Sequence, residues 1–105
     1  MKLNMYTIYD MASGIYMRPF FAQADGMASR SFSDIANDKN HEIGKHPEDY
    51  SLWRVGIFDD NKGAVTAEDK ECLCTALELV ALARQTNRGQ QELLADVPVS
   101  PGGTN

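Results

Sequence analysis

The chain has 105 residues, of which 43% are hydrophobic and 24% are charged. That balance is typical of one folded domain and excludes a disordered chain. A membrane-embedded chain is excluded because no apolar run is long enough to cross a bilayer. Fifteen acidic residues against ten basic ones give a net charge of −5, which repels a polyanion unless the basic side chains gather on one face.

The chain opens with two segments that predict a β-hairpin. Residues 3–9 (LNMYTIY) and 15–22 (IYMRPFFA) are rich in β-branched and aromatic side chains, and the Asp, Ser and Gly of residues 10–14 suit a tight loop. We expect the two strands to pair antiparallel. Pro19 cannot donate a hydrogen bond to a neighbouring strand, so the second strand should lie at an edge or carry a bulge there.

A helix is predicted next, from Asp25 to about Asn37, with Asp25 as its cap. The apolar side chains that should pack on the sheet recur at helical spacing. They are Ala28, Phe32, Ile35 and Ala36. Residues 38–49 are polar, charged and broken by Gly44 and Pro47, which predicts a connecting loop.

The second half of the chain predicts two more strands and a helix. Residues 50–58 (YSLWRVGIF) form the third strand, the turn sequence DDNKG follows, and residues 64–66 form a short fourth strand. Thr66 and Asp69 have the spacing of a capping-box variant. The Ala, Leu, Glu and Arg residues that follow them predict a helix to about Thr86.

These elements define the predicted fold class, an α+β domain. Its antiparallel sheet of about four strands, in the order ββαββα, should have both helices packed on one face. The single domain should span residues 1–87. Residues 88–105, which are rich in Gln, Gly and Pro and lack periodicity, should form a flexible tail.

The two cysteines, Cys72 and Cys74, fall within the predicted second helix. Residues two apart point to different sides of a helix, so we expect no disulfide between them, and a reduced pair agrees with an intracellular chain. A zinc site would need more ligands at a suitable spacing. No basic stretch followed by an apolar segment and a cleavage site is present, which also favours the cytoplasm.

One segment gathers side chains that could bind a metal or transfer a proton. They are His41, Glu42, His46, Glu48 and Asp49. The spacing of the two histidines matches no short zinc motif, and Gly44 and Pro47 deny them a shared helix. Gly-rich phosphate loops and nucleophile motifs are missing too. The sequence therefore predicts a protein that is not an enzyme and that holds no metal or cofactor.

The alternation of the hairpin divides its side chains between the two faces of the sheet. One face receives Leu3, Met5, Thr7 and Tyr9 with Ile15, Met17, Pro19 and Phe21, and the other receives Asn4, Tyr6, Ile8 and Asp10 with Tyr16, Arg18 and Phe20. If the helices cover the first face, the second exposes aromatic rings beside an arginine. Single-stranded nucleic-acid binders use that combination, because rings stack on bases and arginine contacts phosphate. A shift of one residue in the pairing exchanges the two faces of a strand, so alternation alone does not decide which face the helices cover.

The predicted interface with single-stranded DNA combines these rings with nearby basic residues. Its members are Tyr6, Tyr16, Arg18, Phe20, Arg30, Lys45 and Arg54. A different interpretation makes the aromatic residues part of the core, or of a contact between two sheets in a dimer. A sheet covered on one side only leaves an apolar patch, and such patches mediate association, so we also expect a homo-oligomer.

Three stretches of the sequence carry a resemblance to a known family. They are residues 16–21 (YMRPFF), 28–38 (ASRSFSDIAND) and 46–60 (HPEDYSLWRVGIFDD). In order and spacing they resemble the small non-structural protein of gokushoviruses, which are single-stranded DNA phages of the Microviridae. The likeness covers roughly residues 1–66.

The resemblance implies an accessory role in viral single-stranded DNA synthesis, or in the switch from replication to packaging, in the cytoplasm of the bacterial host. The family's protein is described as DNA-binding, and no catalytic residues are assigned to it. The family also offers an alternative, an adaptor that binds the phage replication initiator or the procapsid without affinity for DNA. An acidic surface suits a basic protein partner of that kind.

Overall fold

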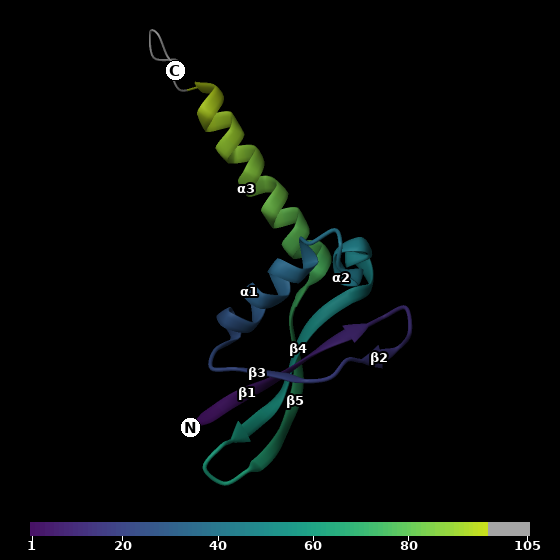
Figure 1. The fold of residues 1–105 in the computed structure, drawn as a ribbon, viewed down its shortest axis with the longest axis vertical. Helices are drawn as coiled ribbons and strands as arrows, with labels where there is room; N and C mark the ends of the chain where they lie inside the picture. Colours follow the sequence, from purple (N-terminus) through teal and green to yellow (C-terminus); the bar gives the residue numbers. More distant parts are fainter. Residues whose placement is uncertain (97–105) are drawn as a thin grey trace.

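The protein is built on one antiparallel sheet with helices on one of its faces, which is the predicted α+β class (Figure 1). The structure is a computed structural model that describes the backbone of residues 1–96 and the side chains of residues 1–87. Its elements, in chain order, are β1 (Lys2–Asp10), β2 (Ile15–Tyr16), β3 (Phe20–Ala22), α1 (Asp25–Ala36), α2 (Glu42–Lys45), the 3₁₀ helix η1 (Pro47–Asp49), β4 (Tyr50–Asp59), β5 (Ala64–Thr75) and α3 (Ala76–Asp96).

The strands lie in the order β2-β1-β4-β5, and β3 pairs with β1 along the same edge as β2. The predicted second strand is therefore present in two pieces. Tyr16 lies opposite Tyr9, and Phe20 lies opposite Tyr6. Pro19 falls in the interruption between the pieces, at the edge of the sheet, which confirms its predicted position.

β5 is much longer than predicted. It has 12 residues and pairs with β4 from Ala64, opposite Asp59, to Thr75, opposite Ser51. The prediction of a helix is therefore wrong over residues 67–75. This stretch contains good helix formers, but its pairing with β4 outweighs the local propensity.

α3 begins only at Ala76, behind a capping box that differs from the predicted one. The backbone N–H of Glu78 donates to Thr75 Oγ1 at 3.1 Å, and the backbone N–H of Thr75 donates to Glu78 Oε1 at 3.2 Å. These two bonds satisfy donors that the start of a helix leaves unpaired. Thr66 and Asp69, which were expected in this role, lie within β5.

The far end of α3 continues past the predicted domain boundary at residue 87. The backbone of residues 88–96, which were assigned to the tail, is helical. The rest of the predicted tail, residues 97–105, lies outside the described residues. Figure 1 shows α3 leading away from the sheet, with its first turns beside α1.

Cys72 and Cys74 consequently lie on a strand and not on a helix. Cys74 is opposite Leu52 and packs against the core, whereas Cys72 is opposite Trp53 and is exposed. Neighbouring residues of β4 point to opposite faces, so the two thiols lie on opposite sides of the sheet. Both are free cysteines, as predicted.

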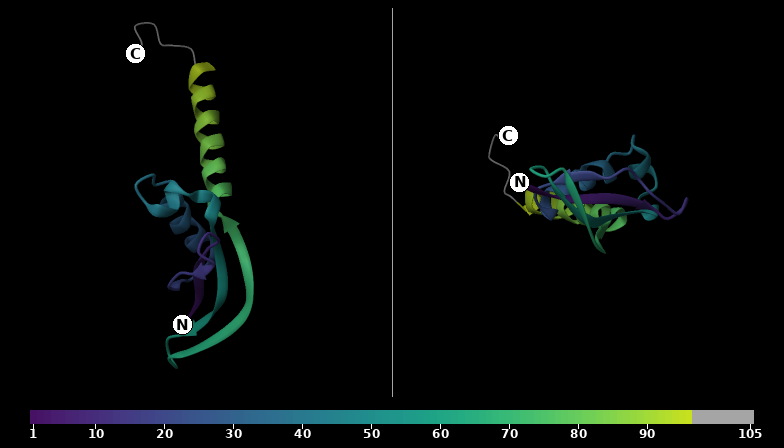
Figure 2. Two further views of the ribbon diagram at one scale, coloured as in Figure 1. Left: turned by 90° about the vertical axis from the view of Figure 1, so that its right-hand side faces the viewer. Right: turned by 90° about the horizontal axis from the view of Figure 1, so that it is seen from below.

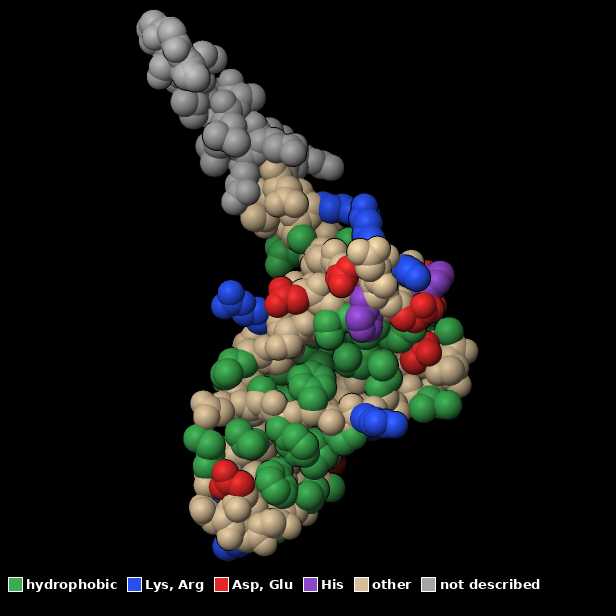
Figure 3. All heavy atoms as spheres, viewed as in Figure 1, with side chains coloured by type: hydrophobic (Ala, Val, Ile, Leu, Met, Phe, Trp, Pro, Cys, Tyr) green, Lys and Arg blue, Asp and Glu red, His purple; other side chains and the backbone are tan. Residues whose placement is uncertain are grey.

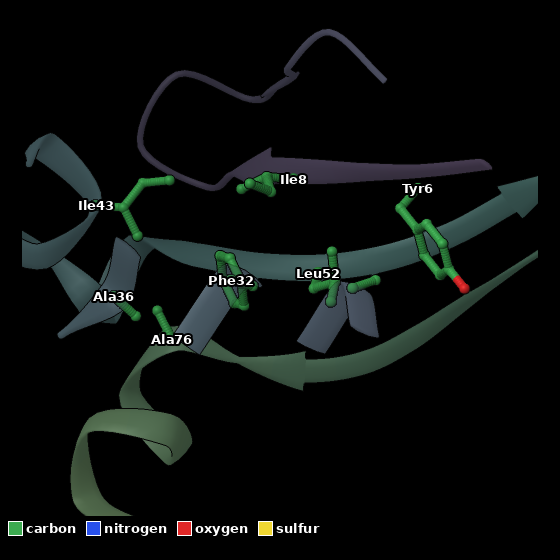
Figure 4. Close-up of a cluster of buried hydrophobic side chains, with 8 residues drawn as sticks. Tyr6, Ile8, Phe32, Ala36, Ile43, Leu52 and Ala76 are labelled. Carbon is green, nitrogen blue, oxygen red and sulfur yellow. The ribbon is translucent and has the colours of Figure 1, made fainter. Parts of the chain in front are cut away.

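The core lies between α1 and one face of the sheet (Figure 4). Its largest fully buried side chains are Tyr6, Phe32, Ile43 and Leu52. Ala28, Phe32 and Ala36 form the buried stripe of α1, which confirms the helical spacing read from the sequence. Ala76, the first residue of α3, completes this cluster.

The loop predicted over residues 38–49 contains the short helices α2 and η1. His41 Nδ1 accepts a hydrogen bond of 3.1 Å from the backbone N–H of Ile43, which caps α2. A Cβ at Gly44 would lie 1.8 Å from the carbonyl oxygen of Asp38. Only glycine therefore lets α2 pack this closely on the chain after α1, and the packing brings Ile43 into the core.

The sheet is strongly bent, and α1 lies on the concave side of the bend (Figure 2). The pairing of β4 with β5 shifts register between Leu52 and Trp53 and again between Arg54 and Gly56. Such irregularities bend a strand and increase its twist. Within the described residues, the convex face carries no helix.

Candidate nucleic-acid interface

α1 covers the face of the sheet that was expected to be exposed. Tyr6 is 0% exposed, and the ring of the half-buried Phe20 stacks on it with 5.6 Å between centroids. Ile8 and Leu52 are buried on the same face. The expectation that Tyr6 and Phe20 offer a stacking surface to bases is therefore wrong, because the apolar stripe of α1 packs there.

Arg54 also lies on this covered face, where carboxylates hold its guanidinium. Its Nη1 donates to Asp25 Oδ2, its Nη2 donates to Glu71 Oε1 at 3.3 Å, and its Nε lies 3.8 Å from Glu68 Oε1. The hydrogen bond to Asp25 and the charge of that carboxylate raise the pKa of Arg54. Arg54 is thus committed to three carboxylates and is not the free cation that a phosphate contact requires.

Asp25 has a different role from the predicted cap. The N-cap of α1 is Ala24, and Asp25 is the first helical residue. Its Oδ1 accepts a hydrogen bond of 2.7 Å from the hydroxyl of Tyr6, which itself accepts one of 3.1 Å from Asn4 Nδ2. Burial, followed by the hydrogen bond to Asp25, raises the pKa of Tyr6. Together with Arg54, this polar chain ties α1 to β1 and β4.

The convex face carries three aromatic rings and a lysine. The rings of Tyr9 and Tyr16 lie 4.6 Å apart between centroids, and Trp53 meets Tyr16 edge-on at 6.4 Å. Lys70 Nζ lies 4.8 Å from the ring centre of Tyr16 and 5.9 Å from that of Trp53, and it donates a 3.1 Å hydrogen bond to the Tyr16 hydroxyl. Tyr9, Tyr16, Trp53 and Lys70 together form the aromatic cluster.

The pairing of the strands and one side-chain hydrogen bond hold these rings in position. Tyr9 and Tyr16 are direct partners in the pairing of β1 with β2, and the indole N–H of Trp53 donates to Ser51 Oγ at 2.8 Å. An ammonium over an exposed aromatic ring adds about 0.5–1 kcal/mol of attraction. Tyr16 nevertheless remains 38% exposed, so part of this side chain is accessible from solvent.

A second surface, the apolar end, lies on the same face toward the β4–β5 turn. It consists of Phe21, Phe58 and Val65: the two phenylalanine rings are 5.5 Å apart, and Val65 lies opposite Phe58 in the ladder. Phe21 is 46% exposed and Val65 is 60% exposed. Exposed apolar groups of this kind are typical of association surfaces.

The remaining predicted residues are exposed but lie on different sides of the molecule. Arg18 falls in the interruption between β2 and β3, two residues after Tyr16. Arg30 lies on α1, and Lys45 is the last residue of α2. The structure therefore brings Arg18 to the edge that holds Tyr16, and places Arg30 and Lys45 on the helix side of the sheet.

Three members of the aromatic cluster were missed at the level of sequence. Tyr9 belongs to the set expected beneath the helices, and Trp53 alternates with Arg54, so both follow from the opposite choice of covered face. Tyr16 does not follow from that choice, because alternation grouped it with Tyr6. That grouping is wrong: the strand is interrupted between β2 and β3, and Tyr16 lies opposite Tyr9. Lys70 was assigned to a helix. No local pattern marks it as part of a strand, because only the pairing of β5 with β4 places it beside Trp53.

The polar segment around His46 does not bring three potential metal ligands together. In residues 1–87, no group of three or more His, Cys, Asp or Glu side chains is arranged to hold a metal ion. His46 lies 3.9 Å from Glu42 and 3.8 Å from Glu48. Burial raises the pKa of both Cys72 and Cys74, which favours the thiol over the reactive thiolate.

Fold and surfaces together define the class: a small α+β protein whose antiparallel sheet is covered by helices on one face and presents aromatic rings on the other. Residues 3–79 match the family described as Phage ORF5 protein, and the chain belongs to this family. The match runs from β1 into the first turn of α3, further than the resemblance noted over residues 1–66. It confirms that the resemblance is to a phage protein.

No curated protein and no solved structure matches the chain. Among the helices that the structure describes, none is long and apolar enough to cross a membrane.

Proposed function

We propose that this phage protein binds single-stranded DNA through the aromatic cluster, as an accessory non-structural protein of viral DNA replication or packaging in the cytoplasm of the bacterial host. The resemblance to the gokushovirus protein supports the choice of ligand, because those phages carry single-stranded genomes. The observation that carries the proposal is that the rings of Tyr9, Tyr16 and Trp53 lie together on the convex face of the sheet.

Stacking provides most of the binding energy in this proposal. A base has two flat faces that any aromatic ring can contact, and each stacked base contributes about 1–3 kcal/mol. The ladder and the neighbouring side chains already hold Tyr16 and Trp53 in place. Little side-chain freedom is therefore lost on binding, which favours affinity.

Electrostatic attraction has a smaller share. Lys70 lies within the aromatic cluster and Arg18 lies at the adjoining edge, whereas the net charge of −5 opposes long-range attraction of DNA. Two phosphate contacts on a single strand predict a slope of about −1.4 for the logarithm of the binding constant against the logarithm of salt concentration. Binding should therefore weaken with salt, but only gently.

The test uses Trp53, which is the only tryptophan of the chain and lies inside the proposed site. A thymidine oligonucleotide should change its fluorescence on binding, and a duplex of equal length should compete poorly. Tyr16→Ala and Lys70→Glu should each weaken binding by roughly tenfold or more, the lower end of what one stacked base contributes. Lys62→Glu makes the same charge change in the β4–β5 turn and should leave affinity within about twofold, since this turn is about 20 Å from Trp53 along β4.

Two results would refute the proposal. One is the absence of any oligonucleotide binding at low salt. The other is a folded Tyr16→Ala protein that binds with unchanged affinity.

The apolar end favours a second candidate function, a protein-interaction adaptor that binds the phage replication initiator or the procapsid. Phe21 and Val65 are more exposed than most side chains of their size and type. Phe21→Asp combined with Val65→Asp should then abolish co-purification with the phage partner after nuclease treatment. The same variant should keep its affinity for DNA if the aromatic cluster is the DNA site. Self-association through this end would appear as a loss of dimers in the double variant.

A further inference from the structure

The helix side of the molecule contains a groove of about 680 Å³ between the end of α1, the short helix α2 and the first turns of α3. Its volume lies within the range of about 300–1,000 Å³ that is usual for ligand sites. Small apolar side chains form part of its lining, namely Ala36 of α1 with Val80 and Ala83 of α3. Ala36 is only 1% exposed, so it lies at the bottom of the groove.

Cationic side chains surround this apolar floor. Lys39, Lys45 and Arg84 line the groove and are exposed, and no carboxylate of the described residues is part of the lining. In residues 1–87 none of the three lies within ion-pair distance of an acidic side chain. Figure 3 shows Lys and Arg side chains where α2 meets α3. This local excess of positive charge contrasts with the net charge of −5 of the chain.

The acidic side chains nearest to the groove have other partners. Asp38 Oδ1 accepts a 2.9 Å hydrogen bond from the backbone N–H of Asn40. Glu42 Oε1 lies 3.9 Å from His46 Nε2, and Glu48 Oε2 lies 3.8 Å from His46 Nδ1. In residues 1–87 no carboxylate forms an ion pair with the cations of the lining, so these cations can pair with an external anion.

The composition of the lining distinguishes between possible anionic ligands. A single phosphate would occupy a small part of the groove. Single-stranded nucleic acid needs aromatic rings for its bases, and the lining contains none. An apolar floor with a cationic rim fits a protein segment that carries aliphatic side chains on one side and carboxylates beside them, as in helix-in-groove recognition.

We propose that this groove is a docking site for an acidic amphipathic segment of a partner protein. The partner's aliphatic side chains contact Val80 and Ala83, and its carboxylates pair with Lys39, Lys45 and Arg84. This site is on the opposite side of the sheet from the aromatic cluster, so the protein can hold a protein partner and DNA at the same time.

The experiment measures binding of a fluorescent probe to the full chain by anisotropy. The probe is a synthetic peptide of leucine and glutamate with its leucines at helical spacing, and the matched control is the same peptide with lysine in place of glutamate. The acidic peptide should bind and the basic one should not. Binding should weaken as salt rises, because the rim charges are exposed to solvent.

Charge reversal locates the site. Lys45→Glu combined with Arg84→Glu should weaken binding of the acidic peptide tenfold or more, and Lys62→Glu, the same change in the β4–β5 turn, should not. Tyr16→Ala should leave peptide affinity unchanged, which separates this site from the proposed DNA site. The proposal is overturned if the acidic peptide does not bind at low salt, if the double reversal has no effect, or if a thymidine oligonucleotide displaces the peptide.

Discussion

The two faces of the sheet contain similar side chains in very different surroundings. On the covered face, Tyr6 is fully buried and its hydroxyl donates to Asp25; on the convex face, Tyr16 is 38% exposed and its hydroxyl accepts from Lys70. Both tyrosines lie in the same antiparallel hairpin. What packs above a ring, and not the type of residue, therefore decides whether that ring belongs to the core or to a binding surface.

The comparison is tested most strongly by removing one ring from each face. Phe32→Ala leaves a cavity where α1 meets the sheet, so the free energy of unfolding should fall by about 3–5 kcal/mol. Phe21→Ala removes a ring that is 46% exposed, and it should cost about 1 kcal/mol. Urea unfolding followed by Trp53 fluorescence measures both. Equal losses would mean that the convex face is packed as tightly as the core.

A second prediction concerns what holds the helical cover in place. Gly44→Ala forces a methyl group against the carbonyl oxygen of Asp38, so stability should fall by roughly 1–3 kcal/mol, as it does on overpacking. Gly26→Ala is the matched control on α1, because nothing lies within 4 Å of its Cβ position. It should raise stability by up to about 1 kcal/mol. A tolerated Gly44→Ala would show that α2 is free to move away from α1.

The third prediction contrasts a tyrosine hydroxyl from each face. Tyr6→Phe removes the group that joins Asn4 to Asp25 and should cost about 1 kcal/mol. Tyr9→Phe on the convex face should change stability by less than about 0.5 kcal/mol. Both losses come from the same urea titrations at neutral pH.

The same pair of variants has a pH signature. Since the pKa of Tyr6 is raised above its ordinary value of 10.0 in the folded protein, its contribution to stability is complete below pH 10.0 and is lost as pH rises through the folded pKa. Stability measured between neutral and strongly alkaline pH should fall less in Tyr6→Phe than in the unaltered protein or in Tyr9→Phe. Parallel curves for all three proteins would contradict the assignment.

The fourth prediction concerns the junction where β5 ends and α3 begins, where the expected loss is as small as that for Tyr6→Phe. Thr75→Ala removes one half of the capping box with Glu78 and should cost about 1 kcal/mol. Thr66→Ala alters the residue that the sequence pattern favoured as the cap, and it should have little effect within β5. Circular dichroism and urea midpoints distinguish the two. A larger loss in Thr66→Ala would contradict the start of α3 at Ala76.

Much of the fold could be predicted from local patterns. The hairpin, the stripe of α1 with Phe32 at its centre, and the strand from Tyr50 depend on alternation or helical spacing within one segment, and all are present. The length of β5 could not be predicted, since residues 67–75 favour a helix in isolation. Their conformation is set by a partner strand, to which the ladder joins Cys72 and Cys74.

The candidate site depended on a choice that local patterns do not make. Alternation correctly grouped Tyr6 with Phe20, and Leu3 with Met5, and both groups are apolar enough to be a core. It wrongly grouped Tyr16 with Tyr6, because the break between β2 and β3 changes the alternation along the strand. α1 packs on the face that holds Tyr6 and Phe20, where Asp25 at the start of the helix accepts hydrogen bonds from both Tyr6 and Arg54. A polar contact between residues so far apart in the chain produces no periodic pattern in the sequence, so it could not be predicted.

The long strand β5 has a consequence for the behaviour of the protein at high concentration. Within the described residues it is the last strand of the sheet, so one row of its backbone groups faces outward and could recruit strands from other molecules into aggregates. The four charged side chains from Glu68 to Glu71 interrupt that row. They leave two uncharged stretches in β5, residues 64–67 and 72–75, and each is shorter than the roughly six residues needed for amyloid-like stacking. The charges of β5 therefore oppose pairing of its open edge with a strand of another molecule.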